Sequence, residues 1–226
     1  LLLRRFEDAL EEFNKAIELD PDDAEYHYRK AHALFMLDRY EDAIKEFNKA
    51  IELNSNRPEY HYHKGNALLR LDRYNEALEE FNKAIELNPN DPDYYYGKGH
   101  ALFMLHRYED SIKEFDKAIE LNPNDPQYYY HKGYALYRLG RYEEALKYAK
   151  KAVELNPSDP YYLVLYVKLE TDLGSPEKGI NKIKDLVASE VVNRNKLCER
   201  IDKELKEIKL NEKEELALMN IKIIIC

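Results

Sequence analysis

Apolar and polar residues alternate along most of the chain with the spacing of an amphipathic helix, and one such stretch is repeated. The sequence RYEDAIKEFNKAIELN at 39–54 returns almost unchanged at 73–88 and 107–122, with a first copy at 5–20 and a looser one at 141–156. Neighbouring copies begin 34 residues apart, as from 39 to 73. The apolar positions of each copy are three and four residues apart, which predicts a helix with one apolar face.

The packing face of this helix, called helix B, combines small and aromatic residues. In the copy at 39–54 it carries Tyr40, Ala43, Phe47 and Ala50, and only the last copy replaces the phenylalanine, with Ala149. Small side chains allow a neighbouring helix to approach closely, while the rings fill the remaining space.

A second amphipathic stretch, helix A, precedes each full copy of helix B, as AEYHYRKAHALFML does from Ala24. Most copies have features of a helix start, since an aspartate before a proline caps the first turn. These caps are Asp91, Asp125 and Asp159, whereas Arg57 supplies none. Short turns between A and B predict antiparallel pairs, and the left-handed residue that ends helix A suits Gly140 better than Asp38, Asp72 or His106.

One such pair cannot bury its apolar face alone, so stacked copies are expected to form a continuous core. The period of 34, the aromatic residue near the start of helix A, and Gly65, Gly99 and Gly133 resemble the tetratricopeptide repeat family over residues 4–159. The resemblance implies an all-α, right-handed superhelical solenoid of antiparallel helix pairs.

Two positions depart from the family pattern. Where the family often has tryptophan, this chain has His27, His61, Tyr95 and Tyr129. Where it often has leucine, this chain has Lys30, Lys64, Lys98 and Lys132, whose ammonium groups are expected to reach water.

The repeat boundaries divide the chain into seven segments. A half repeat with helix B only occupies 1–23, and four repeats occupy 24–57, 58–91, 92–125 and 126–159. A degenerate repeat is expected at 160–192, and a C-terminal capping helix with an apolar tail at 193–226.

Both ends of the array carry unpartnered apolar residues. The half repeat presents Leu2, Leu3, Phe6 and Leu10, which predicts a homo-oligomer formed through this end. In the tail, Ile221, Ile223 and Ile225 either pack on the last repeat or fill a groove of this chain or of a neighbouring copy.

Composition excludes several classes of partner. A net charge of -9 disfavours nucleic acid, and no apolar run reaches the length of a membrane span. The two cysteines, Cys198 and Cys226, match no metal-ligand spacing and are expected to be free thiols in a reducing, cytoplasmic compartment. No phosphate loop, nucleophile motif or zinc motif is present, so neither enzymatic activity nor a cofactor is predicted.

The resemblance implies that one face of helix A lines a concave groove for a protein or peptide ligand. Aromatic side chains with polar tips suit such an interface, although the same residues also serve to pack helix A on helix A. The predicted groove residues are Tyr28, His32, Phe35, Tyr62, His63, Asn66, Arg70, Tyr96, His100, Phe103, Tyr130, His131, Tyr134 and Arg138.

The family geometry places His32 opposite His63, and His100 opposite His131. These pairs are expected to be ordinary polar groove residues, with a weak metal or anion contact as the alternative. Of the carboxylate clamp that some family members use, only Asn66 matches. The predicted function is therefore a scaffold that binds a peptide of unknown identity. The alternative is a self-associating structural module whose groove is filled by its own tail.

Overall fold

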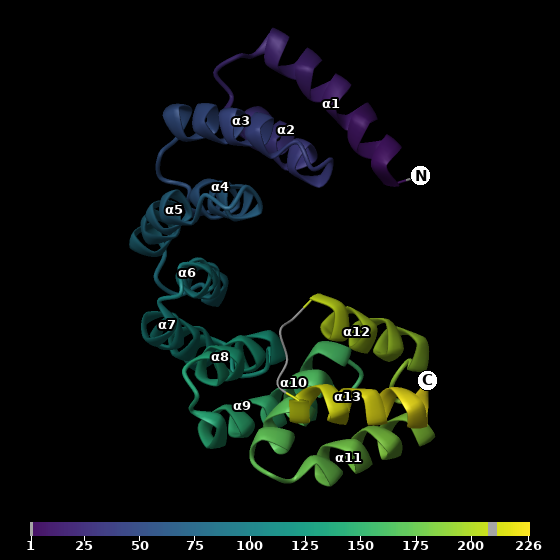
Figure 1. The fold of residues 1–226 in the computed structure, drawn as a ribbon. Coiled ribbons are helices and arrows are strands. Elements are labelled where there is room, and N and C mark those ends of the chain that lie inside the picture. The colour runs from purple at the N-terminus through teal and green to yellow at the C-terminus, as the bar shows by residue number, and fades with distance from the viewer. Residues whose placement is uncertain (1, 208–211) are drawn as a thin grey trace. The chain divides into compact units, whose positions relative to one another are not determined.

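The computed structural model describes residues 2–207 and 212–226, apart from the side chains of residues 2–4, 207, 214, 224 and 225. All secondary structure in this described part is helical, as the repeats predict (Figure 1). The helices form two compact units, one ending at Leu121 and one beginning at Asn122, and each is described by itself. No helix among the described residues is long and apolar enough to cross a membrane.

The first unit contains one unpaired helix B followed by three helix pairs. Its helices are α1 (Leu2–Leu19), α2 (Ala24–Met36), α3 (Tyr40–Leu53), α4 (Pro58–Arg70), α5 (Tyr74–Leu87), α6 (Pro92–Met104) and α7 (Tyr108–Leu121). Each helix A packs on its own helix B, in the pairs α2–α3, α4–α5 and α6–α7. Each helix B also packs on the next helix A, so the pairs stack in chain order (Figure 1).

The ends of helix A follow the expected chemistry. Asp91 accepts a hydrogen bond from the backbone of Asp93, while Arg57 makes no side-chain cap. Asp23, which sequence reasoning did not identify, caps α2 in the same way. Helix A of this unit ends in left-handed backbone at Asp38, Asp72 and His106, with φ of 57°, 58° and 59°. Residues other than glycine adopt this left-handed conformation at a cost in free energy, because their Cβ atom crowds the backbone. Gly140, at the equivalent position of the fourth repeat, has no Cβ atom and avoids that cost.

The core of each pair centres on the phenylalanine of helix B. Phe47, Phe81 and Phe115 have no exposed surface. Phe81 fits because glycine faces it from both neighbours: a Cβ atom on Gly65 would lie 2.9 Å from its ring, and one on Gly97 would lie 2.5 Å from it. Glycine at these positions therefore sets the distance between helices.

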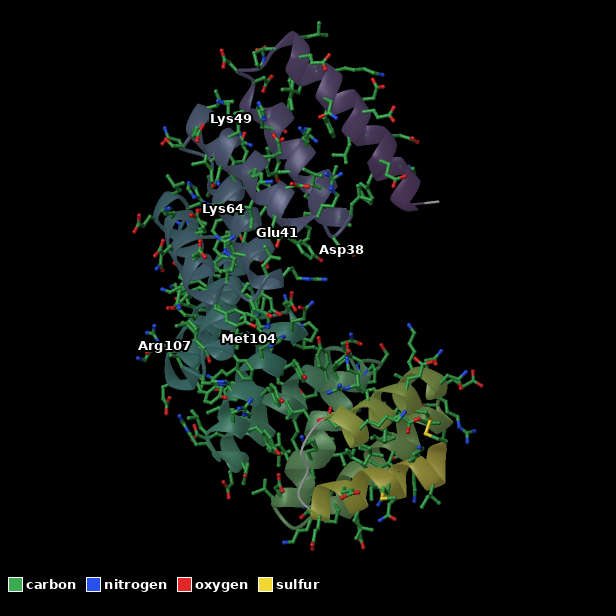
Figure 2. The ribbon with its side chains drawn as sticks, turned by 45° about the horizontal axis from the view of Figure 1, so that its top comes forward. Asp38, Glu41, Lys49, Lys64, Met104 and Arg107 are labelled. Atoms are coloured by element: carbon green, nitrogen blue, oxygen red, sulfur yellow. A yellow bond between two sulfur atoms is a disulfide. The ribbon has the colours of Figure 1, made fainter. Side chains whose placement is uncertain are left out.

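The lysines of helix A do not extend freely into water as expected, because each finds a partner on helix B. Lys30, Lys64 and Lys98 pair with Glu46, Glu80 and Glu114 at 2.7, 2.9 and 2.8 Å. Lys64 is marked in Figure 2. The glutamates are one-fifth exposed or less, so the lysines turn inward to neutralise them.

The second unit contains two helix pairs and a C-terminal helix hairpin. Its helices are α8 (Pro126–Arg138), α9 (Tyr142–Leu155), α10 (Pro160–Asp172), α11 (Pro176–Ala188), α12 (Arg194–Glu207) and α13 (Glu212–Ile225). In this unit Asp125 and Asp159 cap α8 and α10, and helix A of the first pair ends at Gly140 with φ of 72°. Lys132 is buried and donates a hydrogen bond to the Tyr148 hydroxyl.

The C-terminal segment differs from the expected capping helix with a tail, because the tail residues belong to a second helix. Helix α13 packs on α10 and α11 through Leu218 and Ile221, which have no exposed surface. Ile223 is 79% exposed, so the expectation that it packs on the last repeat is wrong. The side chain of Ile225 lies outside the described residues, as do those of Leu2 and Leu3.

The expectation of two free thiols is also wrong. Cys198 on α12 and Cys226 after α13 form a disulfide with their Cα atoms 5.9 Å apart, drawn as a yellow bond in Figure 2. The two cysteines are 28 residues apart in sequence, and the α12–α13 hairpin brings them together. Their spacing therefore gave no signal before the hairpin was known. A cytoplasmic location remains a prediction.

Candidate functional site

One face of helix A in the first unit carries a row of tyrosines at equivalent positions. The rings of Tyr28, Tyr62 and Tyr96 lie 6.1, 6.1 and 6.0 Å from the phenylalanine of their own helix B. Tyr28 and Tyr62 also contact a tyrosine of the next helix A, at 4.8 and 5.2 Å. All three are half-buried, so each has one part packed between helices and one part on the surface.

Histidines lie beside these tyrosines. The rings of His32 and His63 face each other edge to face at 5.5 Å, as the geometry implied by the family resemblance placed them. The ring of His63 also stacks on Phe47 at 6.3 Å. Burial, followed by the nearby His32, lowers the pKa of His63 to about 4, and burial also lowers the pKa of His32 and of His100. This face therefore presents neutral imidazoles at neutral pH.

Two polar residues complete the surface of α4. Asn66 lies next to Tyr62 and interacts with its hydroxyl, whose pKa is raised mainly by burial. The Arg70 guanidinium lies over the Tyr40 ring at 5.2 Å and 3.9 Å from Asp38, with 60% of its side chain exposed. Arg70 is thus positioned at the rim, where a charge remains accessible.

The phenylalanines of the predicted groove pack against the first residue of helix B. The rings of Phe35 and Phe103 each lie 5.3 Å from the aromatic residue that begins helix B, Tyr40 and Tyr108 respectively. Phe103 is only 8% exposed. Its main contribution is to the core of the helix pair.

In the second unit the equivalent face of α8 is a stack of tyrosines. Tyr130, Tyr134 and Tyr137 follow one another with ring separations of 6.1 Å and nearly parallel planes. His131 lies 5.0 Å from Tyr130, and Arg138 is exposed. The prediction that His100 faces His131 concerns residues of separate units and stays a prediction.

The tail occupies the corresponding face of α10. Lys168, which lies 34 residues after Tyr134, donates a hydrogen bond of 3.1 Å to Glu204 of α12. Arg200 of α12 also pairs with Glu204 and lies over the Tyr161 ring at 4.3 Å. The last helix A therefore has its groove-side position covered by the chain's own C-terminal hairpin.

A further cavity was not anticipated from the sequence. It has a volume of about 350 Å³ and lies between α1 and α2. Its lining residues are Phe6, Ala9, Phe13, Tyr28, Arg29, His32 and Ala33. The apolar face of the half repeat was the available signal, but it was interpreted only as a surface for self-association.

The described residues contain no cluster of three or more histidine, cysteine or acidic side chains that could hold a metal ion. The pairing of His32 with His63 thus lacks the further ligands that a stable metal site needs.

Comparison with known proteins decides the family. A model described as tetratricopeptide repeat matches residues 3–58 and 96–160, and a second, described as TPR repeat, matches 65–106. The chain belongs to the tetratricopeptide repeat family. Proteins of this family are generally scaffolds without enzymatic activity, and they bind protein or peptide partners. A comparison with curated proteins found no match.

Several solved structures are similar to this chain. YrrB, described as a TPR protein with an unusual peptide-binding site, is 26% identical, with 77% of this chain and 91% of YrrB covered and a TM-score of 0.64. A MamA RS-1 double mutant is 30% identical, with 69% of this chain and 89% of MamA covered and a TM-score of 0.65. PilF of Pseudomonas aeruginosa is 22% identical, with 80% of this chain and 83% of PilF covered and a TM-score of 0.71. This similarity is one of fold alone.

Proposed function

We propose that the chain is a protein-interaction scaffold that binds a peptide segment along the helix-A face of its first unit. The observation that carries this proposal is the row of half-buried tyrosines and histidines on α2, α4 and α6. Half-buried aromatic side chains offer apolar contact area and lose little conformational entropy on binding, because their rings are already packed. Their polar tips can hydrogen-bond a peptide backbone. The similarity to YrrB supports a peptide as the ligand.

The electrostatics of this face favour an uncharged stretch of peptide. His32, His63 and His100 have lowered pKa values, so they act as neutral donors and acceptors at pH 7. Arg70 at the rim adds one exposed positive charge that suits a ligand carboxylate. Affinity is therefore expected to depend weakly on salt, and to be nearly constant between pH 7 and 8, where the lowered pKa values keep these imidazoles neutral.

The second unit has a smaller role in this proposal. Tyr130, His131, Tyr134 and Arg138 extend the set of candidate ligand contacts on α8. The next position, Lys168 on α10, already contacts Glu204 of the tail. The hairpin of α12 and α13 thus supports the part of the alternative function in which the tail fills the groove, but only at the last helix A.

The test is selection of peptides from a displayed random library on the immobilised chain. Selected peptides are then compared on a variant with Tyr62→Phe and Asn66→Ala, which removes polar tips while keeping the packed ring. A matched control, Lys49→Ala, changes an exposed residue of α3 (Figure 2). Peptides that bind the chain and the control but lose affinity for the groove variant support the proposal. Equal affinity for all three proteins would remove the groove as the binding surface.

Self-association through the half repeat is the second candidate. It is favoured by the partly exposed face of α1, where Phe6, Ala9 and Phe13 line a cavity. Light scattering over a hundredfold range of concentration tests it. Growth in mass with concentration, abolished by Phe13→Glu, supports self-association. A monomer at every concentration removes this candidate and leaves the α1 face free for another occupant. We expect no catalysis in either case.

A further inference from the structure

The groove-side positions of α10 are buried, although the equivalent positions of α8 are partly exposed. On α8 these positions hold three tyrosines, each with part of its surface exposed: Tyr130, Tyr134 and Tyr137. On α10, 34 residues later, they hold Val164, Lys168 and Thr171, which are 2%, 3% and 4% exposed. The C-terminal hairpin supplies the additional cover, because both α12 and α13 pack on α10 (Figure 1).

The buried face of α12 consists of two apolar residues and one acid. Leu197 and Ile201 have no exposed surface and Glu204 is 2% exposed, at spacings of four and three residues that place all three on one side of the helix. Glu204 accepts a hydrogen bond of 3.1 Å from Lys168, whose ammonium also lies 4.9 Å from the ring centre of Tyr137 on α8. Removing one partner of a buried ion pair is strongly destabilising, so this position requires an acidic group whenever it is covered.

Helix α12 combines an imperfect polar contact with a covalent link. The Nε atom of Arg200 is buried and has no hydrogen-bond partner among the described residues, which costs free energy. The disulfide between Cys198 and Cys226 joins α12 to the end of α13. Helix α13 is itself packed on α10 and α11. The bond therefore fastens α12 to a helix that is anchored independently.

This disulfide is accessible to a reducing agent. Cys226 is exposed and Cys198 is partly exposed, so a thiolate from solution can reach the bond. A glutathione-type thiol or a dithiol protein would supply two electrons and itself become a disulfide, while Cys198 and Cys226 take up two protons as free thiols. Reduction removes the cross-link and leaves the apolar contacts of α13 in place.

We propose that α12 is a redox-controlled cover of the ligand face of the second unit. In the oxidised chain the disulfide keeps Glu204 on Lys168 and closes the groove-side position of α10. In the reduced chain α12 exchanges with the peptide ligand, and an acidic side chain of that ligand takes the place of Glu204. The inference rests on the proposed peptide-binding function, extends it to the second unit, and names a carboxylate as the ligand group.

Hydrogen exchange of the full chain, with and without reductant, tests the cover directly. Reduction is expected to speed exchange in α12 about tenfold or more, because the cross-link no longer restricts the detached state of this helix. Exchange at residues 216–222 of α13 should change less than about threefold, since their packing does not depend on the disulfide. Cys198→Ser should behave as the reduced chain does, whether or not reductant is present.

A labelled peptide tests whether the uncovered position accepts a ligand. The peptide, RNKLSERIDKELKE with a fluorescein label, copies residues 194–207 with serine in place of the cysteine. Fluorescence anisotropy is expected to show saturable binding to the Cys198→Ser chain, about tenfold or more tighter than to the oxidised chain. The tethered α12 still competes with the peptide, so adding Ile201→Glu to the Cys198→Ser chain should strengthen peptide binding further.

A charge exchange tests the contact with Lys168. On the Cys198→Ser chain, a peptide with lysine in place of the residue that copies Glu204 should bind about tenfold more weakly. Adding Lys168→Glu to the chain should recover the affinity for that peptide. Lys151→Glu on the exposed side of α9 is the matched control and should change neither titration.

Four results would overturn the inference. Equal exchange of α12 in the oxidised and reduced chains would mean that the disulfide does not hold it. An equal rise in exchange of α12 and α13 would make the hairpin one structural cap. Absent peptide binding, or equal binding to the oxidised and Cys198→Ser chains, would remove the covered position. Binding that survives Lys168→Glu but is lost with Tyr62→Phe and Asn66→Ala would place the peptide on the first unit, which removes this inference and leaves the proposed function standing.

Discussion

The buried carboxylate of Glu80 offers the sharpest test of how the repeats are held together. Its side chain is 5% exposed and accepts hydrogen bonds from His61 at 2.6 Å, Lys64 at 2.9 Å and Lys83 at 3.1 Å. The perturbation is Glu80→Gln, which keeps the shape of the side chain and removes its charge. The amide has a single acceptor oxygen and no charge, so it cannot accept from His61 on one side and from Lys64 on the other, and Lys64 loses its ion pair in a poorly hydrated position.

The size of the effect follows from the pKa of this carboxyl. Burial raises it, but the hydrogen bonds from His61 and the lysines outweigh burial and hold it at about 2, against 4.5 for an unperturbed glutamate. A difference of about 2.5 units corresponds to about 3 kcal/mol of stability. Because the folded pKa is the lower one, this contribution is complete above about pH 4.5 and is lost as the pH falls towards 2.

The assay is urea unfolding followed by circular dichroism, together with hydrogen exchange of residues 58–87. We expect Glu80→Gln to lower the free energy of unfolding by about 2–4 kcal/mol at pH 7. The matched control is Glu79→Gln, which changes an exposed neighbour and should cost less than about 0.5 kcal/mol. Since repeat arrays often unfold in steps, faster exchange confined to α4 and α5 is expected even if the main transition moves little.

Two outcomes would refute the reasoning. One is equal stability of Glu80→Gln and Glu79→Gln at pH 7, because it would mean that the network contributes nothing. The other is a stability difference between wild type and Glu80→Gln that stays constant from pH 7 to pH 3. Subtracting the variant's free energy of unfolding from that of the wild type cancels the acid response of the other carboxylates. A difference that does not change with pH would therefore show that Glu80 does not titrate as described.

Three further predictions address backbone, packing and the tail. His106→Gly should raise stability by about 1 kcal/mol, because the residue holds φ of 59° and its contact with the Tyr108 hydroxyl is exposed; thermal unfolding measures it. Gly97→Ala should cost about 1–3 kcal/mol, because its Cβ would lie 2.5 Å from the Phe81 ring, and adding Phe81→Leu should recover part of the loss in a double-mutant cycle. Cys198→Ser should lower the stability of the C-terminal hairpin by about 2–4 kcal/mol, and reductant should then have no further effect on its unfolding.

The repeat pattern predicted the helical pairs because the information is local and occurs several times. Spacings of three and four residues from Tyr40 to Ala50 define one face of a helix, and residues 34 apart must then play the same part. The contact of His32 with His63 came from the geometry that the family resemblance implies, in which neighbouring helices A stack in register. Asp91 is another local case, because a cap acts on the backbone two residues away.

Features that depend on two distant segments were missed. Cys198 and Cys226 meet only because α13 folds back on α12, which no spacing rule encodes. Ile223 follows the apolar pattern of the tail, yet it faces outward because Leu218 and Ile221 occupy the packed side of α13. The cavity beside Phe13 could be predicted only by knowing how completely the equivalent Phe47 is covered.

The two departures from the family pattern meet on one glutamate in the first two repeats, where the histidine and the lysine contact the same carboxylate. In the first repeat, the two ring nitrogens of His27 face Glu46 at 2.7 Å and the carbonyl of Pro21 at 3.2 Å. In the third and fourth repeats a tyrosine stands at this position and donates to the equivalent carbonyl, that of Pro89 or Pro123, at 3.1 or 3.0 Å. Both residue types therefore fasten the loop before helix A.

The partner of the lysine lies on helix B. In the first three repeats it is a glutamate, which the histidine also contacts where one is present, as His61 and Lys64 both do with Glu80. In the fourth repeat the glutamate is replaced by Tyr148, whose hydroxyl accepts from the buried Lys132 at 2.7 Å while the ammonium lies 3.9 Å from the ring centre. The lysine thus keeps a partner in every repeat, by ion pairing or by cation–π contact. Acid should accordingly loosen the second repeat, which holds Glu80, before it affects the fourth, and hydrogen exchange at pH 3 can distinguish the two.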